Sequence, residues 1–275
     1  MELNEYRIRN DLKGPAARLK LQVHEEVTST NDLLKDMALE GAPGGTVLLA
    51  AAQTGGRGRM GRSFYSPPGT GLYMSLLLRP SMKAEPALAV TTLAAVAAAE
   101  AVERLPNVKG QCSIKWVNDL ELRGRKIAGI LTEGRISPGG AEAEYLIMGI
   151  GFNVREPEEG FPRAIAETAG AIYPPGTSKA DEDFVRERLA SGFLNAFMER
   201  WTAFEETGIP AYMEEYRRRC SVLGKTVTLL GADHLPLPDQ PAVTVVGIGD
   251  GAQLIAAYPD GSRKCLSSGE ISIRV

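Results

Sequence analysis

The segment from Gln53 to Arg62 has the composition expected of an anion-binding loop. It contains four glycines, three arginines and no acidic residue, and no carboxylate occurs between Glu40 and Glu85. Glycine lets backbone amides approach an anion closely, and arginine supplies forked donors suited to carboxylate and phosphate oxygens. A solvated connector or an element that binds nucleic-acid phosphates has similar composition. The position of the loop between two apolar strands favours a site.

A second set of polar residues lies at a strand end, in Lys115-Trp116-Val117-Asn118-Asp119. Lys115 is flanked by apolar residues, so it requires either an anionic partner or a route to solvent. The pair Asn118-Asp119 is compatible with a simple turn. As a functional group, the Asp119 carboxylate would orient Lys115, coordinate Mg²⁺ or steer an incoming lysine.

Two further stretches place polar or small residues at element ends. Ser29 or Thr30 is suited to cap a helix that has Asp32 in its first turn, and the same hydroxyls would also suit a polar ligand group. Gly149 and Gly151 end a predicted strand, where a backbone without side chains lets a flat ligand approach closely.

The chain lacks the motifs of several other chemistries. It has no P-loop Gly-Lys-[Ser/Thr] at the required spacing, no visible nucleophile–histidine arrangement and no metal-ligand cluster in the sequence. Arginine, lysine and glycine amides instead suit a reaction between two anions, in which charge repulsion is the barrier. A carboxylate attacking the α-phosphate of a nucleotide is such a reaction.

Composition restricts the partners and the compartment. Lysine plus arginine number 31 against 34 aspartate plus glutamate, so no overall positive charge attracts nucleic acid or anionic membrane. Three scattered cysteines indicate a reducing compartment. The polar amino terminus lacks a secretory signal, and the alanine-rich run 86–99 is too short to span a membrane. These features predict a cytoplasmic protein.

The pattern of elements predicts the α+β class and not a doubly wound parallel sheet, because adjacent strand hairpins are mixed with packing helices. Residues 1–20 are expected to form an N-terminal arm, 21–221 a large catalytic domain and 222–275 a small β-barrel domain. The predicted strands of the large domain are 21–27, 46–52, 72–78, 111–117, 126–135 and 144–153. Its predicted helices are 32–40, 85–105, 181–206 and 209–219, and the small domain is expected to hold strands 222–230, 242–248, 253–258 and 271–275.

Together these stretches resemble the ordered motif series of the biotin protein ligases. The matching segments are Ser29-Thr30-Asn31, Gln53 with Gly55-Gly56-Arg57-Gly58-Arg59-Met60-Gly61-Arg62, Lys115 to Asp119, Lys126 to Leu131, Gly149 to Val154 and Ser268 to Ser272. The resemblance runs from about residue 20 to the end. It implies a mixed-sheet, class II synthetase-like catalytic domain followed by an SH3-like barrel. It also implies two half-reactions, in which biotin and MgATP form biotinyl-5′-AMP and a lysine of a biotin carboxyl carrier protein then receives the biotinyl group.

The resemblance assigns roles residue by residue. Ser29, Thr30 and Gln53 would hold the ureido ring of biotin, with Asn31 beside them. Gly56, Arg57 and Gly58 would belong to the loop that lines the biotin pocket, and Arg59 and Arg62 would bind phosphates. Lys115 would lie between the biotin carboxylate and the α-phosphate, and Phe64 would cover the adenine. Asn118, Asp119, Lys126 and Gly129 would serve the nucleotide, the metal ion and the approach of the carrier lysine.

Two departures and two rivals accompany the resemblance. Val117 stands where the family commonly has proline, and Phe64 where it often has tryptophan. Residues 1–20 are too few for the winged-helix DNA-binding domain of bifunctional members, so a ligase without DNA binding is expected. A homodimer is left open. The first rival is a lipoate or octanoate ligase, which lacks support because no Arg-x-Ser-Gly-Gly-Gly motif occurs. The second is a protein without ligase activity, either a nucleic-acid-binding module or a biotin-sensing protein that binds biotin without making pyrophosphate.

Overall fold

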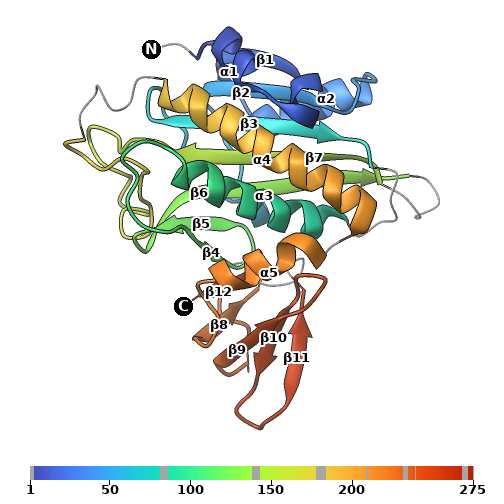
Figure 1. Cartoon of the computed structure of the whole chain (residues 1–275). Helices are drawn as coiled ribbons and strands as arrows, with labels where there is room; N and C mark the ends of the chain where they lie inside the picture. Colours follow the sequence, from blue (N-terminus) through green and yellow to red (C-terminus); the bar gives the residue numbers. More distant parts are fainter. Residues whose placement is uncertain are drawn as a thin grey trace.

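A seven-stranded mixed sheet forms the centre of the protein (Figure 1). The computed structural model describes residues 3–80, 86–137, 143–177, 184–208, 210–231, 235–238, 240–267 and 272–274. The strands lie in the order β1-β2-β3-β7-β6-β5-β4, with β1 parallel to β2 and every other neighbouring pair antiparallel. Their bounds are β1 Lys20–Val27, β2 Thr46–Gln53, β3 Gly71–Leu78, β4 Ser113–Lys115, β5 Asp119–Leu122, β6 Arg125–Ile136 and β7 Ala143–Asn153. The predicted α+β class with a mixed sheet is confirmed.

The two faces of the sheet have different coverings because strand side chains alternate. On β3, Leu72, Met74 and Leu76 belong to the main core, which also holds the apolar residues of α3 (Pro86–Glu103) and α4 (Val185–Thr207). Leu77 points the other way and packs with Leu34 of α2 (Thr30–Leu39). The α2 face is only partly covered by helix, which leaves room for a site beside α2.

The alanine-rich stretch forms the buried helix α3. Its residues Val90 to Ala99 are almost entirely inaccessible to solvent, because the helix packs on the sheet beside α4 and also contacts α5 (Figure 1). Small side chains allow this close approach on both sides of the helix. Among the described residues, no helix is both long enough and apolar enough to cross a bilayer.

The N-terminal segment contains a helix that the sequence does not predict. Helix α1 (Glu5–Asp11) is followed by the 3-10 helix η1 (Gly14–Arg18). Ile8 is fully buried, and Asn195 of α4 both accepts from the Lys13 backbone amide at 2.8 Å and donates to the Asp11 carbonyl at 2.9 Å. Charged residues lie between the apolar residues of this segment, so its helical pattern is difficult to recognise in the sequence. In the fold, the apolar residues form one face that packs on α4.

A five-stranded antiparallel sheet follows helix α5 (Pro210–Arg219). Its order is β11-β10-β9-β8-β12, with bounds β8 Thr226–Leu230, β9 Val243–Ile248, β10 Leu254–Ala257, β11 Arg263–Leu266 and β12 Ser272–Arg274. Strand β11 is absent from the sequence prediction, because its exposed Arg263-Lys264-Cys265 lacks an apolar pattern. Closure into an SH3-like barrel stays a prediction. Residues 268–271 of the C-terminal motif lie outside the described residues.

The predicted strand 111–117 is wrong in its extent. Only Ser113–Lys115 forms β4, residues 116–118 make a turn, and Asp119 begins β5. Pairing of Lys115 with Asp119 across this hairpin places both residues at the same end of it. The error arises because Trp116 and Val117 are buried residues of the turn. Their apolar side chains continue the apolar run of the sequence beyond the end of the strand.

Candidate active site

The register of the sheet brings the motif residues to one face. Ser75, Gly149 and Leu131 form one row across β3, β7 and β6, and Tyr73, Gly151, Gly129 and Asp119 form a second. The rows are two residues apart along the strands, so their side chains point to the same face. Two neighbouring cavities open on this face and share Arg57, Phe64, Gly129 and Leu131.

The first cavity lies at the amino end of α2. The Ser29 hydroxyl caps this helix by accepting from the Asp32 amide at 3.3 Å, as predicted. Gln53 Oε1 accepts from the Thr30 amide at 2.9 Å and lies 3.2 Å from the Thr30 hydroxyl. Gln53 Nε2 donates to the Ser66 hydroxyl at 3.2 Å. This cavity therefore has a wall of oriented donors and acceptors.

A buried serine supports this wall from behind. The fully buried Ser75 hydroxyl lies 2.6 Å from Asn31 Oδ1 and 2.8 Å from the Thr30 hydroxyl, so its single proton is shared between them. Asn31 Nδ2 donates to Glu133 at 2.9 Å. A Cβ on Gly149 would overlap the Asn31 amide, which explains the glycine at this position. The network fixes Asn31 and Thr30 in place.

Phe64 forms the partition between the two cavities. Cβ atoms on Gly151 and Gly129 would lie 2.7 Å and 3.1 Å from its ring, so these two glycines make the space that the ring fills. Tyr73 meets the ring edge-to-face, with centroids 6.2 Å apart, and Lys126 Nζ lies 5.8 Å from the ring centroid. An aromatic plane therefore borders both cavities.

The Gly/Arg loop is a tight hairpin above this partition. Phe64 donates its amide to the Gly56 carbonyl at 2.9 Å, and Gly58 donates to the Arg62 carbonyl at 2.7 Å. Gly56 has no room for a Cβ, which would overlap the Phe64 carbonyl oxygen. Glycine at 56 is required by this close approach.

Arg57 closes the rim of the first cavity. Its guanidinium pairs with Asp32 and, at 2.6 Å, with Glu133. Burial lowers the pKa of Arg57, but the two carboxylates outweigh burial and the net shift is upward. Because the pair engages α2 and β6 together, Arg57 ties the loop to both elements.

The second cavity is lined by cationic groups. Arg59, Arg62, Lys115 and Lys126 all border it, together with Asn118 and Asp119. Arg59 Nη1 donates to Asn118 Oδ1 at 3.0 Å. Burial lowers the pKa of the Arg59 guanidinium, Asp119 opposes the shift, and Arg62 adds to it. A bound anion would stabilise the charged guanidinium and so offset the cost of burying it. The cavity therefore favours a negatively charged ligand.

The side chains of Asn118 and Asp119 tie the turn of residues 116–118 to β6. Asn118 Nδ2 donates to the Ile130 carbonyl at 3.0 Å, which fixes the amide so that Oδ1 faces Arg59. The Asp119 carboxylate pairs with Lys126 Nζ at 2.7 Å. Within the described part of the chain, no group of three or more His, Cys, Asp or Glu side chains forms a metal cluster.

The structure brings nearly all of the sequence-predicted site residues to these two cavities. Gly56 is the exception, because it shapes the hairpin without lining a cavity. Arg57 faces two carboxylates at the rim of the first cavity. The sequence reading misses Ser66, Ser75, Glu133 and Leu131 as site residues. A lone serine inside the apolar strand 72–78 is a signal that would have identified Ser75.

Comparison with known proteins gives a consistent result. Residues 23–153 match the Biotin/lipoate A/B protein ligase family. The "Bifunctional ligase/repressor BirA" of Bacillus subtilis (strain 168) is 33% identical over 73% of this chain, and the match spans only 61% of that protein. The "Biotin--[acetyl-CoA-carboxylase] ligase" of Mycobacterium tuberculosis is 31% identical, covering 82% of this chain and 80% of that protein.

A solved structure extends the similarity to the whole fold. The "Biotin protein ligase from Aquifex aeolicus in complex with biotin and ATP" has a TM-score of 0.75 and 29% sequence identity, with 93% of this chain and 98% of that chain covered. The family match, the sequence identities and the similarity of the fold lead to one conclusion. The chain belongs to the Biotin/lipoate A/B protein ligase family, and within it to the biotin protein ligases.

Proposed function

We propose that the protein activates biotin with ATP to give biotinyl-5′-AMP and then transfers the biotinyl group to a lysine of a biotin carboxyl carrier protein. The observation that carries this proposal is the junction of the two cavities. A pocket of mainly neutral donors and acceptors, with Arg57 at its rim, opens across Phe64 and Gly129 into a pocket lined by five cationic side chains: Arg57, Arg59, Arg62, Lys115 and Lys126. A molecule with a polar ring at one end and a carboxylate at the other would reach from one into the other.

Biotin would occupy the first cavity. Its ureido group carries one carbonyl oxygen and two N–H groups, which match the hydroxyls of Ser29 and Thr30 and the oxygen of Gln53. Asn31 and Ser75 would keep this wall rigid, so that little side-chain ordering accompanies binding. The carboxylate at the far end would then face Lys115.

The nucleotide would occupy the second cavity. Arg59 and Arg62 are suited to the phosphates, and Lys115 to the α-phosphate and the biotin carboxylate together. The Phe64 ring, which packs over Gly129, offers a plane against adenine. Asn118 holds Arg59 in the cavity through its hydrogen bond.

The chemistry follows from charge. A biotin carboxylate oxygen attacks the α-phosphorus, the bond from that phosphorus to the bridging oxygen breaks, and pyrophosphate leaves with the electron pair. Two anions repel each other, and Arg59, Arg62 and Lys115 offset that repulsion in a partly desolvated cavity. Holding both reactants in adjoining pockets also removes the entropy cost of their encounter.

Mg²⁺ fits this site as a companion of the nucleotide. One carboxylate, that of Asp119, borders the cationic cavity, and it is paired with Lys126 at 2.7 Å. Magnesium commonly binds through one or two carboxylates together with substrate phosphates. Asp119 and Asn118 would hold the ion, which supplies neutralisation of phosphate charge when bound.

In the second half-reaction a carrier lysine attacks the carbonyl carbon of the mixed anhydride, and AMP leaves. An amine must be neutral to attack, so a carboxylate near its path, such as Asp119, would accept a hydrogen bond from the lysine and assist proton loss. Release of Asp119 from Lys126 would accompany the arrival of the carrier.

The wider assignments are proposals of the same kind. Residues 21–221 would form the catalytic domain, preceded by the arm 1–20, and 222–275 the small β domain. Buried free Cys112 and Cys220 support a reducing, cytoplasmic setting. The net charge of −3 gives no support to a DNA partner.

The decisive experiment is biotin-dependent exchange of labelled pyrophosphate into ATP. The proposal expects exchange with biotin and none without it, and lipoate or octanoate should not replace biotin. Folded protein that binds biotin but gives no exchange would be a sensor and not a ligase. Exchange driven by lipoate would reassign the substrate within the family.

A further inference from the structure

The turn of residues 116–118 has contacts from outside the central sheet. The turn joins β4, which ends at Lys115, to β5, which begins at Asp119, and Asn118 is part of the turn. The Trp116 indole N–H donates to the Ala252 carbonyl at 3.0 Å, and the Trp116 side chain is almost fully buried. Ala252 belongs to the hairpin between β9 and β10 of the C-terminal sheet.

Helix α5 contacts the same turn from a second direction. The hydroxyl of Tyr216 donates to the Val117 carbonyl at 3.2 Å, and Tyr216 is fully buried. Burial raises the pKa of Tyr216 well above its ordinary value, so the hydroxyl keeps its proton and remains a donor. The Val117 carbonyl lies one residue from the amide that holds Arg59.

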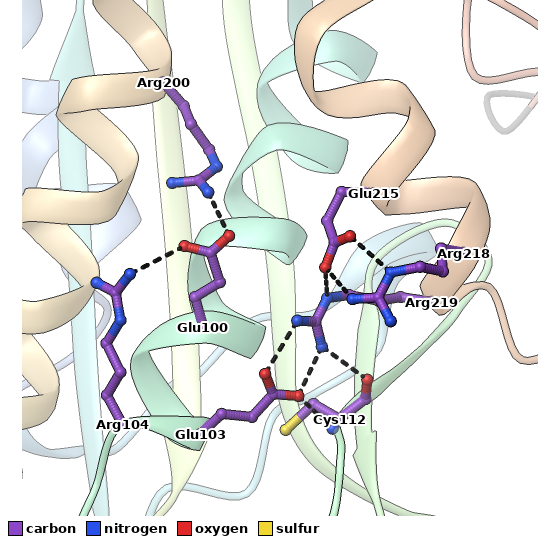
Figure 2. Close-up of polar contacts among 8 residues, drawn as sticks. All are labelled: Glu100, Glu103, Arg104, Cys112, Arg200, Glu215, Arg218 and Arg219. Atoms are coloured by element: carbon purple, nitrogen blue, oxygen red, sulfur yellow. Dashed lines mark hydrogen bonds and ion pairs between the residues drawn. The ribbon is translucent and has the colours of Figure 1, made fainter.

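Helix α5 and the hairpin are also joined to each other. Arg217, the neighbour of Tyr216, donates to the Ile248 carbonyl at 2.9 Å and pairs with Asp250 at 2.5 Å. At the end of α5, Arg219 binds Glu103 of α3 and Glu215, and donates to the Cys112 carbonyl just before β4 (Figure 2). The turn, α5 and the hairpin therefore hold one another in a closed set of contacts.

We infer that Tyr216 and Trp116 are positioning residues for the activation step, through which α5 and the C-terminal sheet hold the Lys115–Asp119 turn in its working geometry. This inference rests on the proposed function. Both contacts use backbone or ring atoms of the turn, so they constrain where Lys115 and Asn118 emerge and leave the biotin pocket at α2 untouched. Displacement of catalytic groups by about 1 Å can lower a rate by about a hundredfold.

The chain offers a matched control on the same helix. Tyr212 is also a buried α5 tyrosine, and its hydroxyl donates to the Ala89 carbonyl of α3 at 3.0 Å. Tyr212→Phe and Tyr216→Phe each delete one buried hydroxyl from α5, and only the second contacts the turn. Their stabilities in urea should fall by similar amounts, while their catalytic behaviour should differ.

The test measures pyrophosphate exchange at saturating biotin and ATP, together with the biotin Kd by calorimetry. Tyr216→Phe should lower kcat by about tenfold or more, with the biotin Kd within about twofold of wild type. Tyr212→Phe should change neither value by more than about twofold. Trp116→Phe, which keeps an aromatic ring and removes the indole donor, should resemble Tyr216→Phe and carries the test if that variant fails to fold.

Three outcomes would overturn the inference, and each has a different meaning. Equal kcat values for the Tyr216 and Tyr212 variants, in an active enzyme, would show that the contact is only structural. Absence of biotin-dependent exchange in the wild-type chain would instead remove the proposed function and the inference with it. A loss confined to biotin affinity would also contradict positioning of the turn.

Discussion

At the scale of single residues, the site depends on the placing of a few polar atoms between two cavities. Arg59 is desolvated and held by Asn118, and Lys115 borders the same cavity. The first cavity depends as much on residues that lack side chains, since Gly149, Gly151 and Gly129 make the space for Asn31 and Phe64. Both features lead to substitutions with specific consequences.

Substitution of Lys115 should abolish most of the activation chemistry and leave the fold intact. Loss of one preorganised cation at the developing charge typically costs about 10²–10³ in rate, so Lys115→Ala should reduce biotin-dependent pyrophosphate exchange by at least that order. Lys109→Ala, which removes an exposed lysine shortly before β4, is the control and should retain wild-type exchange. A Lys115→Ala enzyme with normal exchange would disprove the role of this lysine.

Gly149→Ala should weaken biotin binding by more than about tenfold, because its Cβ would displace the Asn31 amide and disturb Ser75 and Thr30 behind the ureido wall. Calorimetry with biotin measures the change. Gly192→Ala in α4 is the control, since its Cβ would make only an ordinary contact with Ala101 at 3.8 Å. Unchanged affinity in Gly149→Ala would mean that the wall does not hold biotin.

At the scale of elements, the ion pairs of α5 anchor the helix that contacts the catalytic turn. Arg219 is buried and engages Glu103 through two nitrogen–oxygen contacts of 2.6 and 2.9 Å (Figure 2). Glu215 binds Arg218 and Arg219. Hydrogen bonds, first from Arg218 and then from Arg219, lower the pKa of Glu215 to about 2 against an ordinary value of 4.5. The anchor should therefore depend on pH.

The sign of that dependence is fixed by the direction of the shift. A carboxyl with a lowered folded pKa stabilises the fold above its unfolded pKa, and the contribution is lost as pH falls through the folded value. Glu215→Gln should thus be less stable than wild type at pH 6, and the gap should close between about pH 4.5 and 2. Urea unfolding at several pH values measures this.

The neighbouring Glu214 provides the control for this pH experiment. It is exposed on the same helix, so Glu214→Gln removes the same charge without removing a contact to Arg219. Its difference from wild type should be small and nearly constant with pH. A gap for Glu215→Gln that does not close in acid would contradict the assignment of the shift to these arginines.

At the scale of the whole molecule, segments far apart in sequence share one core. The N-terminal helix α1 packs on α4, while α5 and the C-terminal hairpin meet the turn beside β4. The main core cluster accordingly includes residues from Leu3 to Ala256.

Ile8→Ala tests the N-terminal part of this core. Ile8 is fully buried against α4, and truncating such a side chain typically costs about 2–5 kcal/mol of unfolding free energy. Alanine favours helix, so the loss would report packing and not propensity. Tyr6→Ala, at a side chain that is 72% exposed on the same helix, should change stability by less than about 0.5 kcal/mol. Equal effects would show that α1 adds little to the core.

Local patterns in the sequence determined the types of most elements and the identity of most site residues. Apolar runs bounded by turn residues predicted β2, β3, β6 and β7 within one or two residues, because a short continuous apolar run is typical of a strand buried on both faces. The Gly/Arg loop and the Lys115–Asp119 motif were visible because their composition is costly unless a ligand or solvent compensates it. Helix α1 and strand β11 were missed, since their signals are short and polar.

The tertiary structure alone decided how these pieces act together. Registry across β3, β7 and β6 set Ser75, Gly149 and Leu131 in one row at the first cavity, and sequence distance carries no information about such pairing. Likewise the contacts of Trp116 with Ala252 and of Tyr216 with Val117 join residues about 100 or more positions apart. Burial and hydrogen-bond geometry are properties of the packed chain, so the positions of the catalytic groups emerge only once the whole fold is assembled.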